Sequence, residues 1–345
     1  MRAAVYEGPG NIRIQHVPDP EVELPTDAVV RVVSATVCGS DLWSYRGYGQ
    51  RIPGTRIGHE FVGVVSDVGS EVRTVRAGDL VVSPATWSDG TCEYCLDGLQ
   101  TSCVDGGIFG EPGHDGAQGE AVRVPHADGT LVVVPPVLRD ADAGLLLPLC
   151  EVLPAGHHAA HSAGVRFGRR VVVVGDGAVG LSAVLASRRL GADSVVMIGH
   201  HEERLELARR LGATDTVLGR GDEALEQVIT LTGGAHAVLE CVGAQASLDT
   251  AVAVARDGAK IGYVGVPHLV DGLDLGLLYG RNIGVCGGIA PARAYIPELL
   301  TDIALGSLDA SALLDETVDL EGVPEAYVAM DGRKAVKVRV DVSTV

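Results

Sequence analysis

The region between residues 170 and 266 constrains the fold most strongly, because short apolar runs alternate there with helical segments. The first run, RRVVVV, leads through the glycine turn GDGAVG into a helical segment and then into the apolar run SVVMIG. The alternation continues through LELARRLGA, DTVL, EALEQVITLTG, AHAVLECVG, LDTAVAVARDG and AKIGYVGV. Strands separated by helices predict a parallel sheet covered by helices, and LDTAVAVARDG is expected to be helical throughout.

The sequence before residue 150 has a different pattern. The runs AAVYEG, NIRIQHV, AVVRVVSA and FVGVVSDVGS indicate strands without long helical segments between them, which is typical of a barrel-like or sandwich domain. Near Gly287 helices and strands punctuated by proline return, and KAVKVRVDV is expected to be a closing strand. The predicted fold class is therefore α/β plus β: 1–150 and 288–345 form one domain, and 151–287 is an inserted, doubly wound domain.

The charge balance limits the possible partners. Lys and Arg together number 27 and Asp and Glu 45, a net charge of −18, which is unfavourable for binding nucleic acid or an anionic membrane. No apolar stretch reaches the ~18 residues of a membrane span, and the N-terminus lacks the apolar core of a signal peptide. We therefore expect a cytoplasmic protein.

A glycine motif opens the helix after the first strand of the inserted domain. Gly175, Gly177 and Gly180 have the spacing G-x-G-x-x-G. In this context the first glycine makes the tight turn, the second lets the backbone approach a pyrophosphate, and the third lets the helix pack on the strand. The motif predicts a dinucleotide site; the alternative is a tight turn without a ligand.

The end of the second strand bears on which dinucleotide is bound. An acidic residue is expected there to bind the ribose 2′-hydroxyl, but Gly199 occupies its place. His200, His201 and Arg204 can supply donors or positive charge to a 2′-phosphate, so the sequence favours NADP(H) over NAD(H). NAD(H) stays open because Glu202 can turn into the site, and the histidines can instead be turn residues that face solvent.

Two features of the first domain suggest a catalytic metal. Cys38 follows a strand, and His59 begins the next strand. Cys and His are zinc ligands, and a catalytic zinc takes three protein ligands and keeps one open position. The third ligand is expected from elsewhere in the chain, where Glu151 lies next to Cys150.

A second cluster, SDGTCEYCLDGLQTSC, suggests a structural metal. It holds Cys92, Cys95 and Cys103, with Asp89 three residues before the first cysteine. Closely spaced thiols in a loop are typical of a zinc clip, in which Asp89 can fill the fourth position. The alternative is three free thiols or the remnant of a lost site.

These motifs together resemble the zinc-containing alcohol dehydrogenases of the medium-chain dehydrogenase/reductase superfamily. GHEFVGVVSDVGSEV is similar to the family signature, and the similarity continues through RAGDLVV, the cysteine loop, the glycine motif and ECVG. The resemblance implies a GroES-like catalytic domain with an inserted Rossmann domain. It also implies a homodimer or homotetramer formed through the edge of the Rossmann sheet.

The resemblance also implies roles for individual residues. Cys38, His59 and Glu151 match the catalytic zinc ligands, Glu151 rather than Cys150 because it lies five residues before Gly156. Asp89, Cys92, Cys95 and Cys103 match the structural zinc ligands.

The remaining implied roles concern proton transfer and the cofactor. Ser40 matches the first proton-relay group, and Asp41 matches the residue that orients the histidine ligand. Glu60 matches a carboxylate that can approach the zinc. Lys337 matches a basic residue near the cofactor phosphates.

One departure concerns the proton relay and the substrate pocket. The chain has CGSDLW where the family often has CGTDxH, so Trp43 replaces the histidine that ends the relay. Trp43, Trp87 and Phe109 are candidates to shape the substrate pocket, although Trp43 can also be ordinary packing.

The resemblance predicts reversible oxidation of an alcohol to an aldehyde or ketone, with NADP(H) favoured. Two alternatives remain open. One is a zinc-free quinone or enoyl reductase of the same superfamily, and the other is a non-catalytic NADP(H)-binding protein.

Overall fold

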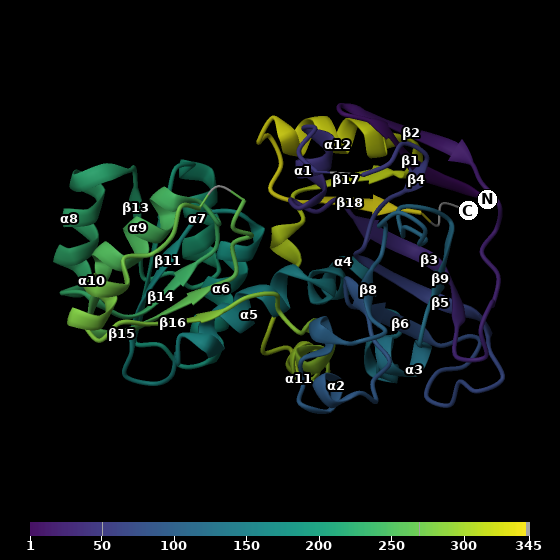
Figure 1. Ribbon diagram of the computed structural model, residues 1–345, viewed down its shortest axis with the longest axis horizontal. Coiled ribbons are helices and arrows are strands. Elements are labelled where there is room, and N and C mark those ends of the chain that lie inside the picture. Colours follow the sequence, from purple (N-terminus) through teal and green to yellow (C-terminus); the bar gives the residue numbers. More distant parts are fainter. Residues whose placement is uncertain (50, 269, 343–345) are drawn as a thin grey trace. The chain divides into compact units, whose positions relative to one another are not determined.

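The computed structural model describes residues 1–49, 51–268 and 270–342. It divides into two compact units (Figure 1). The first unit joins Met1–Glu151 to the segment that begins at Pro291, and the second unit is Val152–Ala290.

The second unit is built on a six-stranded sheet with the order β13-β12-β11-β14-β15-β16, and all neighbouring strands are parallel. Its strands are β11 (Arg170–Val174), β12 (Ser194–Gly199), β13 (Asp215–Leu218), β14 (Ala235–Glu240), β15 (Ala255–Tyr263) and β16 (Gly284–Gly287). Numbered along the chain, this order is 3-2-1-4-5-6, the order of the doubly wound dinucleotide-binding fold. The predicted parallel sheet is therefore confirmed.

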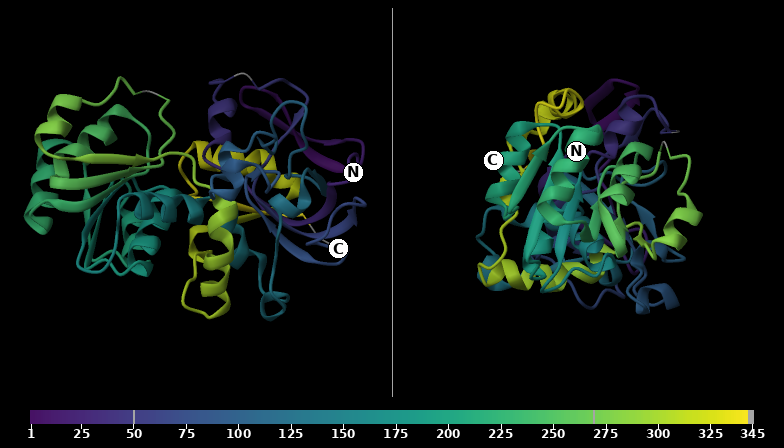
Figure 2. Two further views of the ribbon diagram at one scale, coloured as in Figure 1. Left: turned by 60° about the horizontal axis from the view of Figure 1, so that its bottom comes forward. Right: turned by 90° about the vertical axis from the view of Figure 1, so that its left-hand side faces the viewer.

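Helices cover both faces of this sheet (Figure 1 and Figure 2). They are α5 (Val152–Ser162), α6 (Ala178–Arg189), α7 (Glu202–Arg210), α8 (Gly221–Thr232), α9 (Gln245–Val254) and α10 (Leu275–Gly280). Right-handed crossovers place α6 and α7 on one face, and α8 and α9 on the other because the strand order reverses at β14. The central strands are buried on both faces, which is why β11 and β12 read as continuous apolar runs.

The end of α9 differs from the prediction. LDTAVAVARDG was expected to be helical throughout, but α9 ends at Val254 and Ala255 already begins β15. Ala255 pairs with Ala235, and the register of β15 then shifts before Lys260 pairs with Ala237. Pairing with β14 therefore overrides the local helical pattern.

The first unit contains mainly short strands. They are β1 (Arg2–Gly8), β2 (Asn11–His16), β3 (Ala28–Thr36), β4 (Thr55–Arg56), β5 (Phe61–Val68), β6 (Leu80–Ser83), β7 (Thr86–Trp87), β8 (Gly107–Ile108), β9 (Ala121–Val124), β10 (Val132–Val133), β17 (Glu316–Asp319) and β18 (Val338–Asp341). They form sheets of order β2-β1-β4, β10-β6-β5-β3-β18-β17 and β7-β8, and β9 also pairs with β3.

Short helices join these strands. The α-helices are α1 (Asp41–Tyr45), α2 (Glu93–Leu96), α3 (Ala127–Thr130), α4 (Ala143–Leu146), α11 (Ala292–Ala304) and α12 (Val323–Asp331). The 3-10 helices are η1 (Gln100–Ser102), η2 (Pro136–Leu138), η3 (Leu147–Cys150), η4 (Ser311–Leu313) and η5 (Leu320–Gly322).

The closing strand β18 explains why two distant segments form one unit. It pairs antiparallel with β3, and Val340 lies opposite Ala35. Val338 and Val340 are fully buried in the same core as Val30 and Phe61. The C-terminal segment therefore completes a core that the N-terminal segment begins.

Among the described residues, the structure contains no helix with both the length and the apolar character needed to cross a lipid bilayer.

Candidate active site and metal centres

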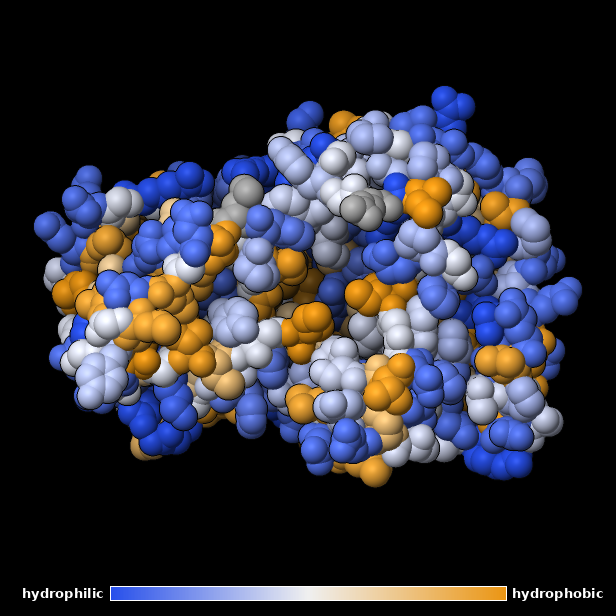
Figure 3. All heavy atoms as spheres, in the orientation of Figure 1, coloured by the Kyte–Doolittle hydropathy of each residue, from blue (hydrophilic) through white to orange (hydrophobic). Residues whose placement is uncertain are grey.

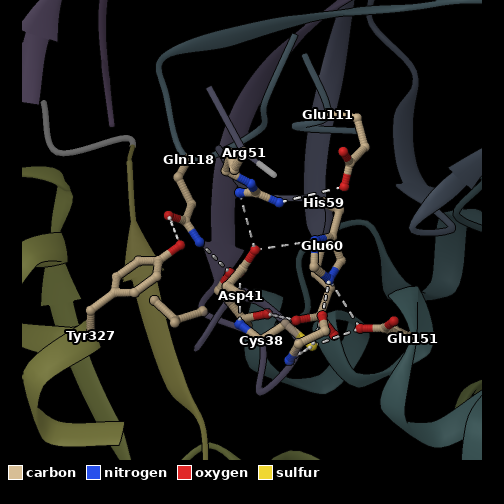
Figure 4. A network of polar contacts seen from close by, with 12 residues as sticks. Cys38, Asp41, Arg51, His59, Glu60, Glu111, Gln118, Glu151 and Tyr327 are labelled. Carbon is tan, nitrogen blue, oxygen red and sulfur yellow. Dashed lines mark hydrogen bonds and ion pairs between the residues drawn. The ribbon is translucent and has the colours of Figure 1, made fainter. Parts of the chain in front are cut away.

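Two neighbouring strands bring Cys38 and His59 together. Cys38 lies just beyond the end of β3, and His59 lies just before the start of β5. These strands are antiparallel, with Ala35 opposite Phe61, so the two side chains meet at one end of the sheet. Both are buried (Figure 4).

Glu151 completes this group from a different part of the chain. It directly follows η3, which is held against the sheet by two hydrogen bonds of Cys150. The Cys150 carbonyl accepts from the Ala85 amide at 3.1 Å, and the Cys150 thiol donates to the Phe61 carbonyl at 3.3 Å. Glu151, and not Cys150, therefore faces Cys38 and His59.

The three side chains converge closely. Oε2 of Glu151 lies 2.8 Å from Cys38 Sγ and 3.1 Å from His59 Nε2. One ligand atom each from Cys38, His59, Glu60 and Glu151 lies within 4.8 Å of all the others. A thiol, an imidazole and a carboxylate are ligands that zinc accepts, and three such ligands suit a catalytic site, so the donor set fits zinc.

The burial of this group perturbs its charges. Burial raises the pKa of the Cys38 thiol to about 11, and the neighbouring Glu151 and Glu60 carboxylates add to the increase. Burial also tends to raise the pKa of Glu151, but His59 outweighs it and lowers that pKa to about 2. Burial opposes charge on His59, yet Asp41 and Glu151 raise its pKa well above the ordinary value. The group is therefore a buried, electronegative site suited to a cation.

Ser40 and Asp41 lie beside the same group, at the start of α1. The Ser40 hydroxyl oxygen lies 3.2 Å from Cys38 Sγ and 3.4 Å from His59 Nε2. Asp41 accepts a hydrogen bond from the Cys38 amide at 3.2 Å, and its other oxygen lies 3.6 Å from His59 Nδ1. That second distance is an ion-pair distance and too long for a hydrogen bond.

Glu60 points to the other side of the site, toward Lys337. Its Oε2 atom accepts from Lys337 Nζ and from the Thr36 hydroxyl, both at 2.5 Å. Lys337 also donates to the Val37 carbonyl at 3.4 Å. The structure thus places Lys337 in contact with Glu60, one residue from His59.

Arg51 is a further residue near this group that the sequence did not predict. Its side chain is 9 % exposed, and its guanidinium lies 3.6 Å from Asp41 and 3.7 Å from Glu111 (Figure 4). Arg51 follows a loop without a periodic pattern, so no local sequence signal placed it beside Asp41.

The aromatic candidates for the substrate pocket separate into two kinds. Trp87 and Phe109 are 5 % and 1 % exposed, and their rings lie 5.3 Å apart in the core of the first unit. The expectation that they shape a pocket is therefore wrong, because they are core side chains. Trp43 lies in α1 with its ring 5.5 Å from that of Tyr48.

The second predicted metal group also converges. Ligand atoms of Asp89, Cys92, Cys95 and Cys103 lie within 4.8 Å of one another. Asp89 Oδ1 accepts hydrogen bonds from the amides of Thr91 and Cys92. Burial raises the pKa of Asp89, but these hydrogen bonds outweigh burial and lower the pKa below its ordinary range. Three thiols and one carboxylate in a loop fit a four-ligand structural zinc.

The glycine motif lies in the second unit, between β11 and α6. Gly175 has a φ of +109°, and a Cβ on Gly180 would lie 1.9 Å from the Gly175 carbonyl oxygen, so both positions need glycine. A Cβ on Gly177 would meet nothing within 4 Å, so no contact within the chain demands glycine there. This pattern matches a loop that a ligand approaches closely at its second glycine.

Gly199 ends β12, and His200 and His201 follow it next to this loop. The His200 Nε2 atom accepts from Arg220 at 2.7 Å, and the His201 Nδ1 atom lies 3.0 Å from Asp176. Arg204 is half-buried in the first turn of α7. Asp176, the residue between the first two glycines, was not considered in the sequence analysis, although GDG placed it in the motif.

Comparison with known proteins agrees with this fold. Residues 24–136 match the family model of the alcohol dehydrogenase GroES-like domain, and residues 178–304 match that of the zinc-binding dehydrogenases. The chain is 32 % identical to zinc-type alcohol dehydrogenase B of Aspergillus flavus, over 98 % of this chain and 80 % of that protein. It is 40 % identical to a medium chain reductase/dehydrogenase of an Acremonium species, over 78 % of this chain and 94 % of that protein.

Solved structures give the same result. The alcohol dehydrogenase of a Thermus species superposes with a TM-score of 0.94 at 32 % identity, covering 99 % of this chain and 100 % of the other. Among similar structures, one is an NAD-dependent alcohol dehydrogenase, and another, a zinc-binding dehydrogenase of Sinorhizobium meliloti, is bound to NADP; each is 26 % identical to this chain.

The fold and the site thus define an oxidoreductase with a GroES-like and a Rossmann part, and the predicted fold class is confirmed. The chain belongs to the zinc-dependent alcohol dehydrogenase family of the medium-chain dehydrogenase/reductase superfamily, as the sequence resemblance indicated.

Proposed function

We propose that this protein interconverts a small-molecule alcohol and the corresponding aldehyde or ketone, with zinc and a nicotinamide dinucleotide as cofactors. The observation that carries the proposal is the convergence of Cys38, His59 and Glu151, with the Ser40 hydroxyl beside them. When bound, zinc supplies a Lewis acid and the dinucleotide accepts or donates the hydride. The alternatives are a zinc-free reductase and a binding protein without turnover.

The residues of the first unit have separate tasks in this proposal. Cys38, His59 and Glu151 hold the metal. The Asp41 charge, at an ion-pair distance from Nδ1 of His59, favours the ring orientation in which Nε2 faces the metal. Ser40 takes the hydroxyl proton during oxidation and returns it during reduction. With Trp43 in place of the usual histidine, we propose that the relay then passes the proton to water.

The second metal group has a structural role in this proposal. Asp89, Cys92, Cys95 and Cys103 supply four ligands, which leaves no open position for a substrate. Such a closed site stabilises the loop that carries it.

The dinucleotide belongs to the second unit. Gly175, Gly177 and Gly180 form the pyrophosphate loop. We assign the second unit, Val152–Ala290, to dinucleotide binding and the first unit, which includes Glu151, to catalysis; both boundaries lie a few residues from the predicted 151–287. Lys337, which the resemblance placed near the cofactor phosphates, is instead buried against Glu60 in the first unit and is not part of this proposed site. The sequence favoured NADP(H) because of Gly199, His200, His201 and Arg204. The Asp176 carboxylate, which lies next to these residues, did not enter that expectation.

We also propose that the protein forms a homodimer or homotetramer through the edge of the Rossmann sheet. One of the two edge strands is β16, and Leu275 and Leu277 of the nearby helix α10 are 76 % and 45 % exposed. Figure 3 shows apolar side chains gathered over α10 and the neighbouring strands. Light scattering of the purified protein tests this part of the proposal.

We also propose a cytoplasmic location, because thiolate zinc ligands need a reducing compartment.

The first experiment measures zinc per subunit and turnover together. Protein purified without chelator is analysed by elemental mass spectrometry and assayed with a panel of aldehydes and with NADH and NADPH. We expect about two zinc ions per subunit and reduction of at least one aldehyde, from one ligand set of each kind. Cys38→Ser is expected to lose one zinc and the activity.

Cys286→Ser serves as the matched control, because Cys286 is exposed and belongs to neither metal group. Full turnover in Cys38→Ser, or in protein that zinc cannot load, would favour the zinc-free reductase. Tight dinucleotide binding without turnover of any substrate would favour the binding protein.

A further inference from the structure

In this fold an acidic residue normally stands at the end of the second strand. Here the side chain of Asp176, which follows the first strand, occupies that place. Asp176 follows β11, and Gly199 ends β12. These strands are parallel neighbours with Val174 opposite Ile198, so their carboxyl ends lie side by side. A Cβ on Gly199 would lie 2.6 Å from both Cβ and Oδ2 of Asp176. The Asp176 carboxylate therefore fills the space of the missing side chain at position 199.

The contacts of Asp176 hold its carboxylate in place. Its Oδ2 atom accepts hydrogen bonds from the amides of His200 at 2.6 Å and His201 at 2.8 Å, and lies 3.0 Å from the His201 ring nitrogen. The residue is only 6 % exposed. Burial raises the pKa of Asp176, but the two amides and His201 outweigh that effect and lower it below its ordinary value. The carboxylate is therefore ionised at neutral pH.

The same contacts decide what else can bind there. Two successive backbone amides form a small anion-binding site, which could otherwise receive a 2′-phosphate. Asp176 Oδ2 already occupies both amides, while Oδ1 accepts no hydrogen bond from any described residue. Oδ1 can accept from a ribose hydroxyl, whereas a phosphate would meet a like charge.

Arg220 and His200 do not remove this effect. Arg220 donates its Nε–H to His200, not to Asp176, and burial with the proximity of Arg220 lowers the pKa of His200. His200 therefore stays neutral near pH 7 and its ring nitrogen is already engaged. Some of the side-chain donors that favoured NADP(H) in the sequence thus already form hydrogen bonds within the chain.

We propose that Asp176 selects the coenzyme, and that it selects NAD(H) over NADP(H) by replacing the absent acid at position 199. This inference rests on the proposed dehydrogenase function and reverses the preference expected from the sequence. It assigns coenzyme choice to the glycine loop itself.

Direct binding measurements test the inference without relying on activity. The zinc-loaded protein is titrated with NADH and NADPH by calorimetry, and then with AMP and adenosine 2′,5′-bisphosphate to isolate the ribose contact. We expect NADH to bind at least ~10-fold more tightly than NADPH, as like-charge repulsion requires. Asp176→Asn keeps an oxygen for the two amides but removes the charge. It is expected to reduce the ratio of the NADPH to the NADH dissociation constant by ~10-fold or more, chiefly through tighter NADPH binding.

Asp215→Asn is the matched control, because Asp215 is exposed at the start of β13, away from the carboxyl ends of the strands. It removes the same charge and is expected to leave the ratio unchanged. A wild-type preference for NADPH, or equal changes for both coenzymes in Asp176→Asn, would overturn the inference but leave the dehydrogenase intact. Binding of neither coenzyme would overturn both.

Discussion

The Nζ atom of Lys337 lies 2.5 Å from Oε2 of Glu60, and the two side chains are 1 % and 0 % exposed. This buried ion pair joins the C-terminal segment, just before β18, to the start of β5. Burial alone lowers the pKa of Lys337 and raises that of Glu60, and each partner's charge opposes the change in the other. On balance the pKa of Glu60 is raised by burial, and the charge of Lys337 limits this rise and so favours the ionised carboxylate.

Removing Lys337 is expected to destabilise the protein strongly. Lys337→Met leaves the Glu60 carboxylate buried without a counter-charge, which typically costs about 3–5 kcal/mol. Urea denaturation measures the change in unfolding free energy, with exposed Lys334→Met as the control. The double variant Glu60→Gln with Lys337→Met is expected to recover part of the loss. Equal stability of Lys337→Met and Lys334→Met would contradict the prediction.

Ser40 is expected to affect the rate but not the metal. Ser40→Ala removes the proposed proton acceptor and should lower kcat by ~100-fold or more, the typical contribution of general base catalysis. Zinc content should stay unchanged, because Ser40 is not a proposed ligand. Ser44→Ala, in the same helix α1, is the control. An unchanged kcat in Ser40→Ala would exclude this role.

The cysteine loop is expected to bind zinc independently of the active site. Cys95→Ser should reduce the zinc content from about two ions per subunit to about one, because the site needs four ligands. Asp89→Ala should do the same if the carboxylate is the fourth ligand. Elemental analysis and a thermal melt measure both effects, and Cys286→Ser is the control. Full zinc content in Cys95→Ser would argue against a metal in this loop.

Two glycines of the same motif are expected to respond differently to alanine. A Cβ at Gly180 would lie 1.9 Å from the Gly175 carbonyl oxygen, so Gly180→Ala should destabilise the second unit. Gly177→Ala meets no atom within 4 Å and should fold normally, yet bind NADH more weakly because the pyrophosphate approaches there. Thermal melts and calorimetric titrations separate the two effects. Normal NADH binding by Gly177→Ala would argue against a pyrophosphate at this glycine.

Asp128 is expected to make stability depend on pH. Its carboxylate accepts from the amides of Arg73 and Thr74 and from the Thr74 hydroxyl. Burial raises the pKa of Asp128, but these hydrogen bonds lower it below the ordinary value. The stabilisation is therefore complete above the ordinary Asp pKa and is lost as the pH falls through the lowered value.

The corresponding variant is Asp128→Ala. It should lower the unfolding free energy at pH 7 by about 1–3 kcal/mol, and by less near pH 3. Exposed Asp140→Ala is the control, and denaturant titrations at several pH values provide the measurement. A loss that does not depend on pH would show that the Asp128 charge is unimportant.

The sequence predicted much of the fold because the relevant signals are local. The valine runs of β11 and β12 and the spacing of Gly175, Gly177 and Gly180 each lie within a few residues. Fully buried parallel strands and tight strand-to-helix turns leave such patterns directly in the chain. The end of α9 was missed because pairing between Ala255 and Ala235 is a contact between strands.

The candidate metal residues were found by their types and spacing, but their arrangement was not. The resemblance already chose Glu151 over Cys150, and the structure supplies the physical reason: two hydrogen bonds of Cys150 hold η3 against the sheet, so that Glu151 faces Cys38. Trp87 was taken for a pocket residue because the sequence does not show that it packs against Phe109.

By itself, then, the sequence determined the fold class, the family and the residue types available for metal and dinucleotide binding. Only the tertiary structure decided that Lys337 neutralises Glu60 and that Asp176 fills the space beside Gly199. The physical reason is that these pairs are far apart in the chain. They meet only when β18 closes the first unit on β3, and when β11 and β12 pair in register in the second.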